Sequence, residues 1–184
     1  MKEILVEITS LSPLLMNNPE SMLLQKKSSR SRLEEYNPKE EAEKVAYRMK
    51  SKELYIPARA IFGCLIGGAS FKKIGKYSAK SILAGNLRIE PEQVGLGTKT
   101  YEIDLRTVVI QKNRVVKARP VLKNWKVNFK IVYNDDIIKD PDVIKVCLED
   151  AGTRLGLLDY RPQKFGSFGT FKISKWVVGK GKLK

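Results

Sequence analysis

Two stretches in the second half of the chain alternate between apolar and polar residues, and they constrain the fold most. Between 125 and 133 the apolar positions are Trp125, Val127, Phe129, Ile131 and Tyr133; between 101 and 110 they are Ile103, Leu105 and Val109. A period of two is typical of strands that bury one face and expose the other, as in antiparallel sheets. We therefore predict two half-buried strands, with Leu105 and Val109 on the buried side.

Shorter patterns predict the remaining elements. Strands are expected at 2–9, 53–57, 87–91 and 170–178, and Lys112–Pro120 reads as a hairpin tip with its return strand. A helix is expected at 58–67, ended by Gly67-Gly68, and a second begins at Asp140-Pro141-Asp142. The second helix should face the core with Val143, Val146, Cys147 and Leu155. This order predicts an α+β, ferredoxin-like βαββαβ fold of the kind found in RNA-recognition domains.

The length of 184 residues favours a single domain over 1–184. The least regular part, 14–52, reads as an insertion or flexible loop after the first strand. Within it, Asn37-Pro38 is typical of a helix start, and that helix should run to about Met49. Residues 71–84 are basic and ambiguous, and 179–184 form a basic tail.

The charge balance points to a polyanion as partner. Lys and Arg number 35 against 20 Asp and Glu, which gives a net charge of +15 and a pI near 9.8. Such a balance is typical of nucleic-acid binders, although a generically basic soluble protein remains the alternative. The sequence contains no apolar run of the ~20 residues needed to cross a bilayer and no signal-peptide pattern, so we expect a cytoplasmic protein without membrane contact.

Histidine is absent and cysteine occurs only at Cys64 and Cys147. This disfavours histidine-based acid–base or nucleophilic catalysis and a structural zinc site, and we expect two buried thiols. Nucleotide-binding glycine motifs are also missing, so no cofactor is expected. The aspartates at 135, 136, 140 and 142 are better explained by turns and helix capping than by metal binding.

A glycine-punctuated segment, 156–171, carries most of the candidate binding residues. Arg161 and Lys164 supply charge, and glycines such as Gly166 and Gly169 permit close backbone approach. Phe165 and Phe168 offer faces on which bases can stack, although at least one of them is expected to pack in the core. The segment therefore predicts contacts with nucleic acid, and it offers no general base beyond Asp159.

Further candidate cations lie in three places. A ladder on the predicted hairpin comprises Lys112, Arg114, Lys117 and Arg119, which would follow a phosphate backbone unless it is a solvated strand edge. Arg59 stands at a helix start, where backbone N–H groups can hold a phosphate. The run that contains Lys26, Lys27, Arg30 and Arg32 is either a finger over RNA or an ordinary surface loop.

Three segments resemble the RAMP superfamily of CRISPR-associated proteins, particularly the backbone subunits that line a guide RNA. Val6–Leu14 is similar to the opening strand and turn of that family, and Ile56-Pro-Ala-Arg-Ala-Ile-Phe-Gly-Cys-Leu65 is similar to its helix-start motif. Leu155-Gly156 with Gly166 and Gly169 resembles its C-terminal glycine-rich loop. The chain also resembles small uncharacterised phage and archaeal-virus proteins. Ala58-Arg59-Ala60 departs from the small polar residues usual in the helix-start motif.

The resemblance implies a protein that holds single-stranded or guide RNA on a basic surface, as several adjacent copies and without catalysis. A metal-dependent endoribonuclease is the second hypothesis. Some backbone subunits cleave RNA with an early aspartate; here no aspartate precedes Asp104, and Glu20, Glu34 or Glu35 would have to replace it. A viral assembly or decoy protein acting through protein contacts is the third. Single-stranded DNA offers the same chemistry as RNA and stays open as a ligand.

Overall fold

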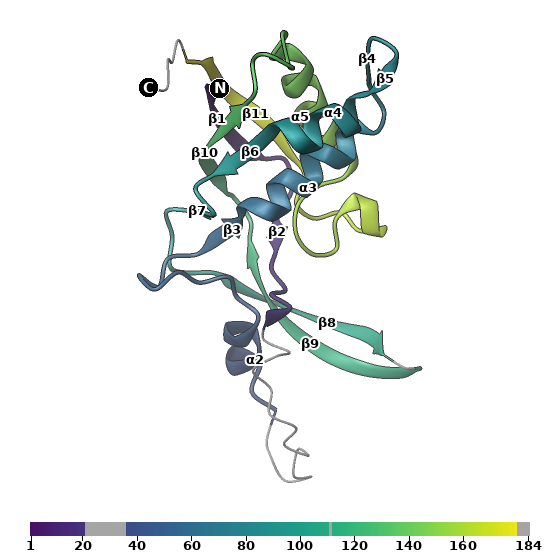
Figure 1. The fold of residues 1–184 in the computed structure, drawn as a ribbon. Helices are drawn as coiled ribbons and strands as arrows, with labels where there is room; N and C mark the ends of the chain where they lie inside the picture. Colours follow the sequence, from purple (N-terminus) through teal and green to yellow (C-terminus); the bar gives the residue numbers. More distant parts are fainter. Residues whose placement is uncertain (21–35, 111, 180–184) are drawn as a thin grey trace.

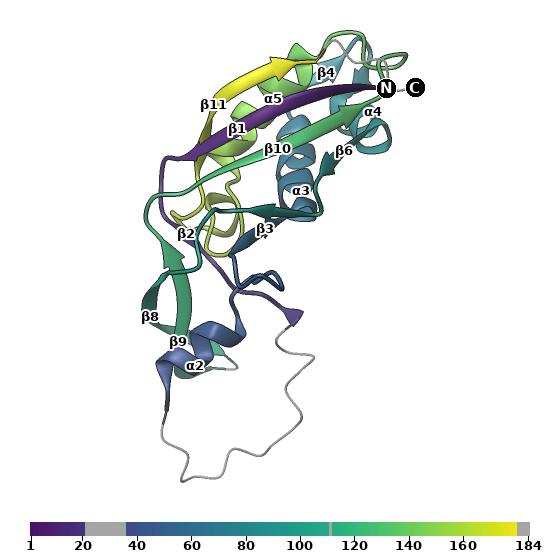
Figure 2. The same ribbon diagram turned by 90° about the vertical axis from the view of Figure 1, so that its left-hand side faces the viewer.

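The computed structural model describes residues 1–20, 36–110 and 112–179 and shows a mixed α+β architecture (Figure 1). The larger sheet has four strands in the order β11-β1-β10-β6, each antiparallel to its neighbour. They are β1 (Lys2–Ser10), β6 (Leu87–Glu90), β10 (Lys126–Tyr133) and β11 (Phe171–Val178). Figure 2 shows these strands side by side, with the helices behind them.

Helices α3 (Ala58–Ala69), α4 (Ala79–Asn86) and α5 (Asp142–Arg154) lie on one face of this sheet. The inward side chains of β1 are Ile4, Val6 and Ile8, which pack in the core with the apolar side chains of β10. Trp125 and the alternate residues of β10 through Tyr133 are all buried. The pattern that predicted this strand and its buried face is therefore confirmed.

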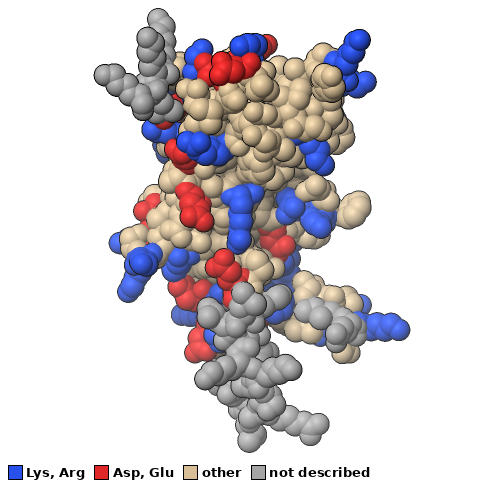
Figure 3. All heavy atoms as spheres, in the orientation of Figure 1, with Lys and Arg blue, Asp and Glu red and all other residues tan. Residues whose placement is uncertain are grey.

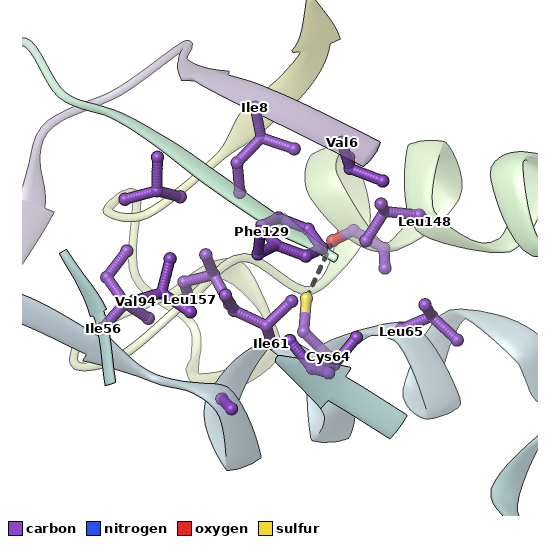
Figure 4. Close-up of a cluster of buried hydrophobic side chains, with 14 of the residues drawn as sticks. Val6, Ile8, Ile56, Ile61, Cys64, Leu65, Val94, Phe129, Leu148 and Leu157 are labelled. Carbon is purple, nitrogen blue, oxygen red and sulfur yellow. Dashed lines mark hydrogen bonds between the residues drawn. The ribbon is translucent and has the colours of Figure 1, made fainter. Parts of the chain in front are cut away.

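The two thiols lie in this core, as expected. Figure 4 shows Cys64 among Ile61, Phe129 and Leu157. Its Sγ donates to the carbonyl oxygen of Ala151 on α5 at 3.6 Å and to that of Gly156 at 3.3 Å. Cys64 and Cys147 are both buried and unlinked. Burial raises the thiol pKa to about 12 for Cys64 and about 11 for Cys147, so both remain protonated near neutral pH.

Glycines in α3 and α5 bring these helices close to their neighbours. A Cβ on Gly68 would lie 2.3 Å from the carbonyl oxygen of Cys147, so α3 and α5 touch here. The prediction that Gly67-Gly68 ends the helix is wrong, because α3 continues to Ala69 and uses these glycines for contact. A Cβ on Gly152 would lie 2.4 Å from the carbonyl oxygen of Phe171, which fixes α5 against β11.

The predicted inner face of α5 is partly wrong. Val146 is 41% exposed and Val143 is only partly buried, whereas Cys147 and Leu155 are buried as expected. The helix packs instead through Ile144, Leu148 and Ala151. These three residues lie at helical spacing from Cys147. In a helix this short, a face shifted by one position, which contains Val143 and Val146, fits the apolar pattern as well.

A second sheet extends below the first, with the order β2-β9-β8. Its strands are β2 (Leu14–Leu15), β8 (Glu102–Ile110) and β9 (Asn113–Leu122), and β8 with β9 forms the predicted hairpin. Shorter pairs are β3 (Tyr55–Pro57) with β7 (Gln93–Gly95), and β4 (Lys73–Ile74) with β5 (Tyr77–Ser78). Residues 71–84 thus hold a small hairpin and the start of α4.

The described parts of 14–52 are ordered elements. β2 pairs with β9, and α2 (Pro38–Lys44) lies beside the hairpin. The side chain of Asn37 accepts hydrogen bonds from the backbone N–H groups of Lys39 and Glu40, so the predicted cap is confirmed. The helix ends at Lys44 rather than near Met49, because Arg48 pairs with Leu54 in a β-bridge.

The predicted burial of β8 is wrong. Leu105 is 54% exposed and Val109 is 69% exposed, while Asp104 on the opposite face has a side chain that is only 14% exposed. Figure 1 shows why: the distal part of the β8–β9 hairpin projects away from α2 and from the layer of α3, α4 and α5, so it has no core to pack against. No helix among the described residues is long and apolar enough to span a membrane.

Candidate nucleic-acid interface

A cleft of about 410 Å³ separates the first turns of α3 from the segment 156–163. Arg59 and Gly63 line it from the helix, and Gly156, Asp159, Arg161 and Gln163 line it from the loop. Sequence reasoning had selected Arg59 and the glycine-rich loop separately. The fold places them on opposite walls of one cleft.

The loop that forms one wall has an unusual backbone. Leu158, Tyr160 and Phe165 all have positive φ, at 60°, 49° and 58°. Non-glycine residues rarely adopt this region, and such conformations persist only where the surrounding contacts hold them. A short 3₁₀ turn, η1 (Pro162–Lys164), lies between Tyr160 and Phe165. The wall is thus a tightly wound turn rather than an open glycine strap.

The glycines of this loop serve its own packing. A Cβ on Gly166 would lie 1.8 Å from the carbonyl oxygen of Tyr160, and one on Gly169 would lie 2.0 Å from that of Leu157. Gly169 also has a φ of +74°. Both positions exclude larger residues because of contacts within the loop, and the two glycines thereby fix the shape of the loop that carries Arg161 and Lys164.

Arg161 is held in place by neutral acceptors. Its Nη1 donates to the carbonyl oxygen of Leu158 at 2.6 Å, and its Nε and Nη2 donate to Oε1 of Gln163 at 3.1 and 3.0 Å. Within the described ranges no carboxylate lies within ion-pairing distance of this guanidinium. Its positive charge is therefore oriented but not neutralised, which suits an anionic ligand.

The two phenylalanines of the loop differ in availability. Phe165 is 98% exposed, so its ring can accept a stacked base. Phe168 is 7% exposed and packs beside Tyr160, with ring centroids 5.9 Å apart. The guanidinium of Arg106 covers Phe168 at 4.9 Å. Phe168 therefore acts as a packing residue of the loop, as one of the two was expected to be, and Tyr160, 41% exposed, adds a second accessible ring.

Ion pairs connect the hairpin to the same loop. Nη1 of Arg119 on β9 lies 2.6 Å from Oδ2 of Asp159, and Nη2 lies 4.0 Å from Oδ2 of Asp104 on β8. The side chain of Arg119 is only 11% exposed. Nε of Arg106 in turn lies 2.9 Å from Oδ1 of Asp104. These contacts orient the hairpin relative to the loop.

The predicted ladder is consequently divided. Lys112 has a φ of 67° and stands with Arg114 at the exposed end of the hairpin. Lys117 pairs with Oε1 of Glu41 at 3.0 Å, and Arg119 points inward. Only Lys112 and Arg114 of the four combine an exposed side chain with no carboxylate partner among the described residues. Lys112 precedes β9, Arg114 lies on one face of β9, and Lys117 and Arg119 lie on the other, so the four cations do not form one continuous row.

The remaining predicted cations are Arg59 and the basic run that contains Arg30 and Arg32. Nη2 of Arg59 lies 3.3 Å from Oε1 of Glu20, and both side chains are more than half exposed. Such a surface pair is weak and leaves Arg59 able to turn into the cleft. Arg30 and Arg32, with Lys26, Lys27, Glu34 and Glu35, lie outside the described residues. Figure 3 shows basic and acidic side chains interleaved over the middle of this face.

Sequence reasoning missed several residues of the cleft. Asn17 lines it from a segment read as irregular, Tyr47 from the end of the helix predicted to reach Met49, and Gln163 orients Arg161. Gln163 lies two residues from Arg161, a spacing that a turn brings together and that could have been noticed. Tyr47 and Asn17 gave no signal, because only tertiary packing brings them to the cleft. No group of three potential metal ligands occurs within the described part of the chain.

Comparison with known proteins adds one finding. No family model matches the sequence, and no curated protein matches it. The structure is similar to a chain of the cryo-EM structure of the Type III-B Cmr-beta bound to cognate target RNA. The TM-score is 0.64 at 17% sequence identity, and the match covers 96% of this chain and 60% of that chain. At this identity the likeness is one of fold alone.

Proposed function

We propose that this chain is an RNA-binding, RAMP-like protein that holds single-stranded or guide RNA without cleaving it. The observation that carries the proposal is the convergence of Arg59 and Arg161 on one cleft, where Arg161 is oriented by hydrogen bonds yet has no carboxylate partner among the described residues. A phosphate in this cleft would meet two guanidinium groups. The fold likeness to a chain of an RNA-bound complex supports the choice of RNA as the polyanion.

The proposal includes an assignment of the fold. We take β1, α3, β6, β10, α5 and β11 as a ferredoxin-like βαββαβ unit, and the β2-β9-β8 sheet with α2 as additions to it. The order β11-β1-β10-β6 supports this, because a ferredoxin-like sheet places its fourth and third strands on either side of the first. The chain spans 60% of the length of the chain it resembles, so the role of that whole protein is not transferred.

The binding surface would extend from the cleft in two directions. Lys164 and the exposed ring of Phe165 lie beside Arg161 on the loop. Lys112 and Arg114 lie at the free end of the β8–β9 hairpin. Phosphates would meet the cations, and bases would stack on Phe165 and Tyr160, each stacked base contributing roughly 1–3 kcal/mol. Several copies would lie side by side along one strand, so bound copies should increase with RNA length.

Equilibrium binding to a 20-nucleotide uridine RNA tests the proposal. Neutralised phosphates release counterions, so log affinity should fall linearly with log salt concentration. Arg161→Ala should weaken binding about tenfold, since a charge-assisted contact is lost. Lys139→Ala, which removes an exposed cation from the segment between β10 and α5, is the control and should leave affinity unchanged. Salt-insensitive binding, or equal affinities for the two variants, would contradict the proposal.

Metal-dependent cleavage of RNA is the second candidate function, and one observation favours it. Asp159 lines the cleft and Glu20 pairs with Arg59 at its edge, so two carboxylates lie near the proposed phosphate position. Incubating labelled RNA with Mg²⁺ or Mn²⁺ separates the two activities. Discrete products that disappear in Glu20→Gln would establish the nuclease; intact RNA in the wild type supports a binding protein.

Purification of the protein without nucleic acid but with a stoichiometric protein partner would instead indicate an assembly or decoy role.

A further inference from the structure

A second cluster of cations and aromatic rings lies at the other end of α3. The small β4–β5 hairpin, with the residues on either side of it, carries Phe71, Lys73, Lys76, Tyr77 and Lys80. Between Leu54 and Ile89 the sequence has six basic residues and no Asp or Glu. The hairpin and α3, which forms one wall of the cleft, therefore belong to one segment of the sequence that has basic residues and no acidic ones.

Its rings are exposed to an extent that core packing does not explain. Tyr77 is 72% exposed and Phe71 is 59% exposed. Lys73, Lys76 and Lys80 are exposed as well, and the side chain of none of them makes an ion pair or hydrogen bond to any residue that the structure describes. Lysines between two accessible aromatic rings are the combination by which proteins contact single strands, through phosphates and stacked bases together.

The base of this hairpin is anchored, although its tip is free. Nζ of Lys72 lies 3.0 Å from Oδ2 of Asp150 on α5, and the guanidinium of Arg154 covers the ring of Phe71 at 5.5 Å. Lys73 pairs with Ser78 and Ile74 with Tyr77, around a turn in which Gly75 has a φ of +59°. Tyr77 is thus presented on a short rigid turn, which lowers the ordering cost of a contact with a ligand.

The hairpin and the cleft lie at the two ends of α3. In Figure 1 the hairpin lies beyond the C-terminal end of α3 and the loop 156–169 lies below the helix. Arg59 and Gly63 of the first turns of α3 line the cleft with that loop. Basic side chains extend from the corresponding upper edge in Figure 3. Twelve residues of α3 separate the two by about 18 Å at 1.5 Å per residue. A single strand of a few nucleotides would span that distance.

We propose that the β4–β5 hairpin is a second contact site for single-stranded RNA, in which Tyr77 stacks on a base and Lys76 binds a phosphate. The proposal rests on the proposed function, since it extends the same RNA beyond the cleft. Phe71 and Lys73 border the site, and Lys80 at the start of α4 lies next to it in sequence. A strand bound in the cleft would continue along α3 to reach it.

The test measures affinity for the 20-nucleotide uridine RNA with Tyr77→Ala, Tyr77→Phe and Lys76→Ala. Tyr77→Ala should weaken binding at least about fivefold, whereas Tyr77→Phe keeps the ring and should remain within about twofold of wild type. Lys76→Ala should lower the salt slope by about 0.7. The matched control, Ile137→Ala with Lys139→Ala, removes an exposed apolar residue and a lysine elsewhere and should change neither quantity.

The outcomes separate this site from the proposed function. If wild type binds RNA and Tyr77→Ala binds equally well, the hairpin proposal is overturned while the cleft proposal stands. If Tyr77→Ala weakens binding and Arg161→Ala does not, the hairpin is supported and the cleft is not. No RNA binding by wild type overturns both. Loss of binding to anionic phospholipid vesicles, with RNA affinity unchanged, would show that the hairpin serves a membrane surface instead.

Discussion

Individual cations in this chain differ in whether their charge is already used. Arg119 and Lys117 are paired with Asp159 and Glu41, and Arg106 lies between Asp104 and the ring of Phe168. Arg161 has only neutral hydrogen-bond acceptors among the described residues. A formal net charge of +15 therefore overstates the surface that can attract RNA. Burial and pairing, rather than residue type, decide which cations remain available.

Gly63 offers a prediction in which stability and binding move in opposite directions. A Cβ there meets nothing within 4 Å, and the position lines the cleft. Gly63→Ala should raise the free energy of unfolding by up to about 1 kcal/mol, because alanine is the better helix former, and should weaken RNA binding by narrowing the cleft. Gly85→Ala in α4 is the matched control, since it also meets nothing. Equal RNA affinities of the two variants, measured beside denaturant titrations, would argue against the cleft.

Residue-level prediction from the sequence succeeded where local chemistry decides and failed where packing decides. Asn37 was identified as a cap because its short side chain can reach the first N–H groups of a helix, whatever lies around it. Phe165 and Phe168 could not be told apart, since both are aromatic and only the fold buries one of them. The partner of Arg119 was equally beyond reach, because Asp159 lies forty residues away in sequence.

At the scale of elements, the β8–β9 hairpin is positioned by contacts at its base. Glu41 on α2 accepts from Nζ of Lys117 and from the backbone N–H of Ala118, both at 3.0 Å. On the other side, Arg119 and Arg106 connect the hairpin to the glycine-rich loop. The hairpin is thus held between α2 and the loop, and its distal end is free to meet a ligand.

The Glu41 contact predicts an acid-sensitive hairpin. Burial tends to raise the pKa of Glu41, but hydrogen bonds from Tyr36, Lys117 and Ala118 together hold it below its ordinary value. A carboxylate whose folded pKa is depressed stabilises the fold above its unfolded pKa of about 4.3, and this contribution is lost as the pH falls through the folded pKa. Glu41→Gln should therefore be less stable than wild type near pH 7 but converge with it in acid.

Urea unfolding at several pH values measures that difference. Glu149→Gln on the exposed side of α5 controls for the loss of one negative charge. A constant gap between wild type and Glu41→Gln from pH 7 down to pH 3 would show that Glu41 does not stabilise the hairpin as a carboxylate. The same titration, followed by a probe on the hairpin, would show whether this element loosens before the larger sheet.

Elements were predicted well where a strand or helix faces the core and poorly where it does not. The alternation in β10 gave the correct buried face, whereas the similar alternation in β8 gave the wrong one. Alternation establishes that two faces differ in polarity, and the rest of the fold determines which of them is covered. β8 extends past the core, so Leu105 and Val109 have nothing to pack against.

At the scale of the whole molecule, the proposed RNA surface lies away from the outer face of the larger sheet. Recognition domains with a similar sheet stack bases on aromatic residues of that face. Here the groove on the outer face is bordered by Leu5, Lys130 and Lys175, a mixture of aliphatic and charged side chains. The loop 156–169 and α3, which line the cleft, and the β4–β5 hairpin instead lie on the helical side. The sequence predicted a basic RNA-binding surface, but which side carries it depends on the packing of α3 against the loop.

Ultraviolet cross-linking of bound uridine RNA, followed by mass spectrometry of the peptides, tests this placement most directly. The account predicts cross-links within 156–169, at Tyr160 or Phe165, and within the first turns of α3. Arg161→Ala should reduce these cross-links more than any others. Cross-links confined to β1, β10 and β11 on the outer face of the sheet, with none in 156–169, would contradict the central claim that RNA is held in the cleft.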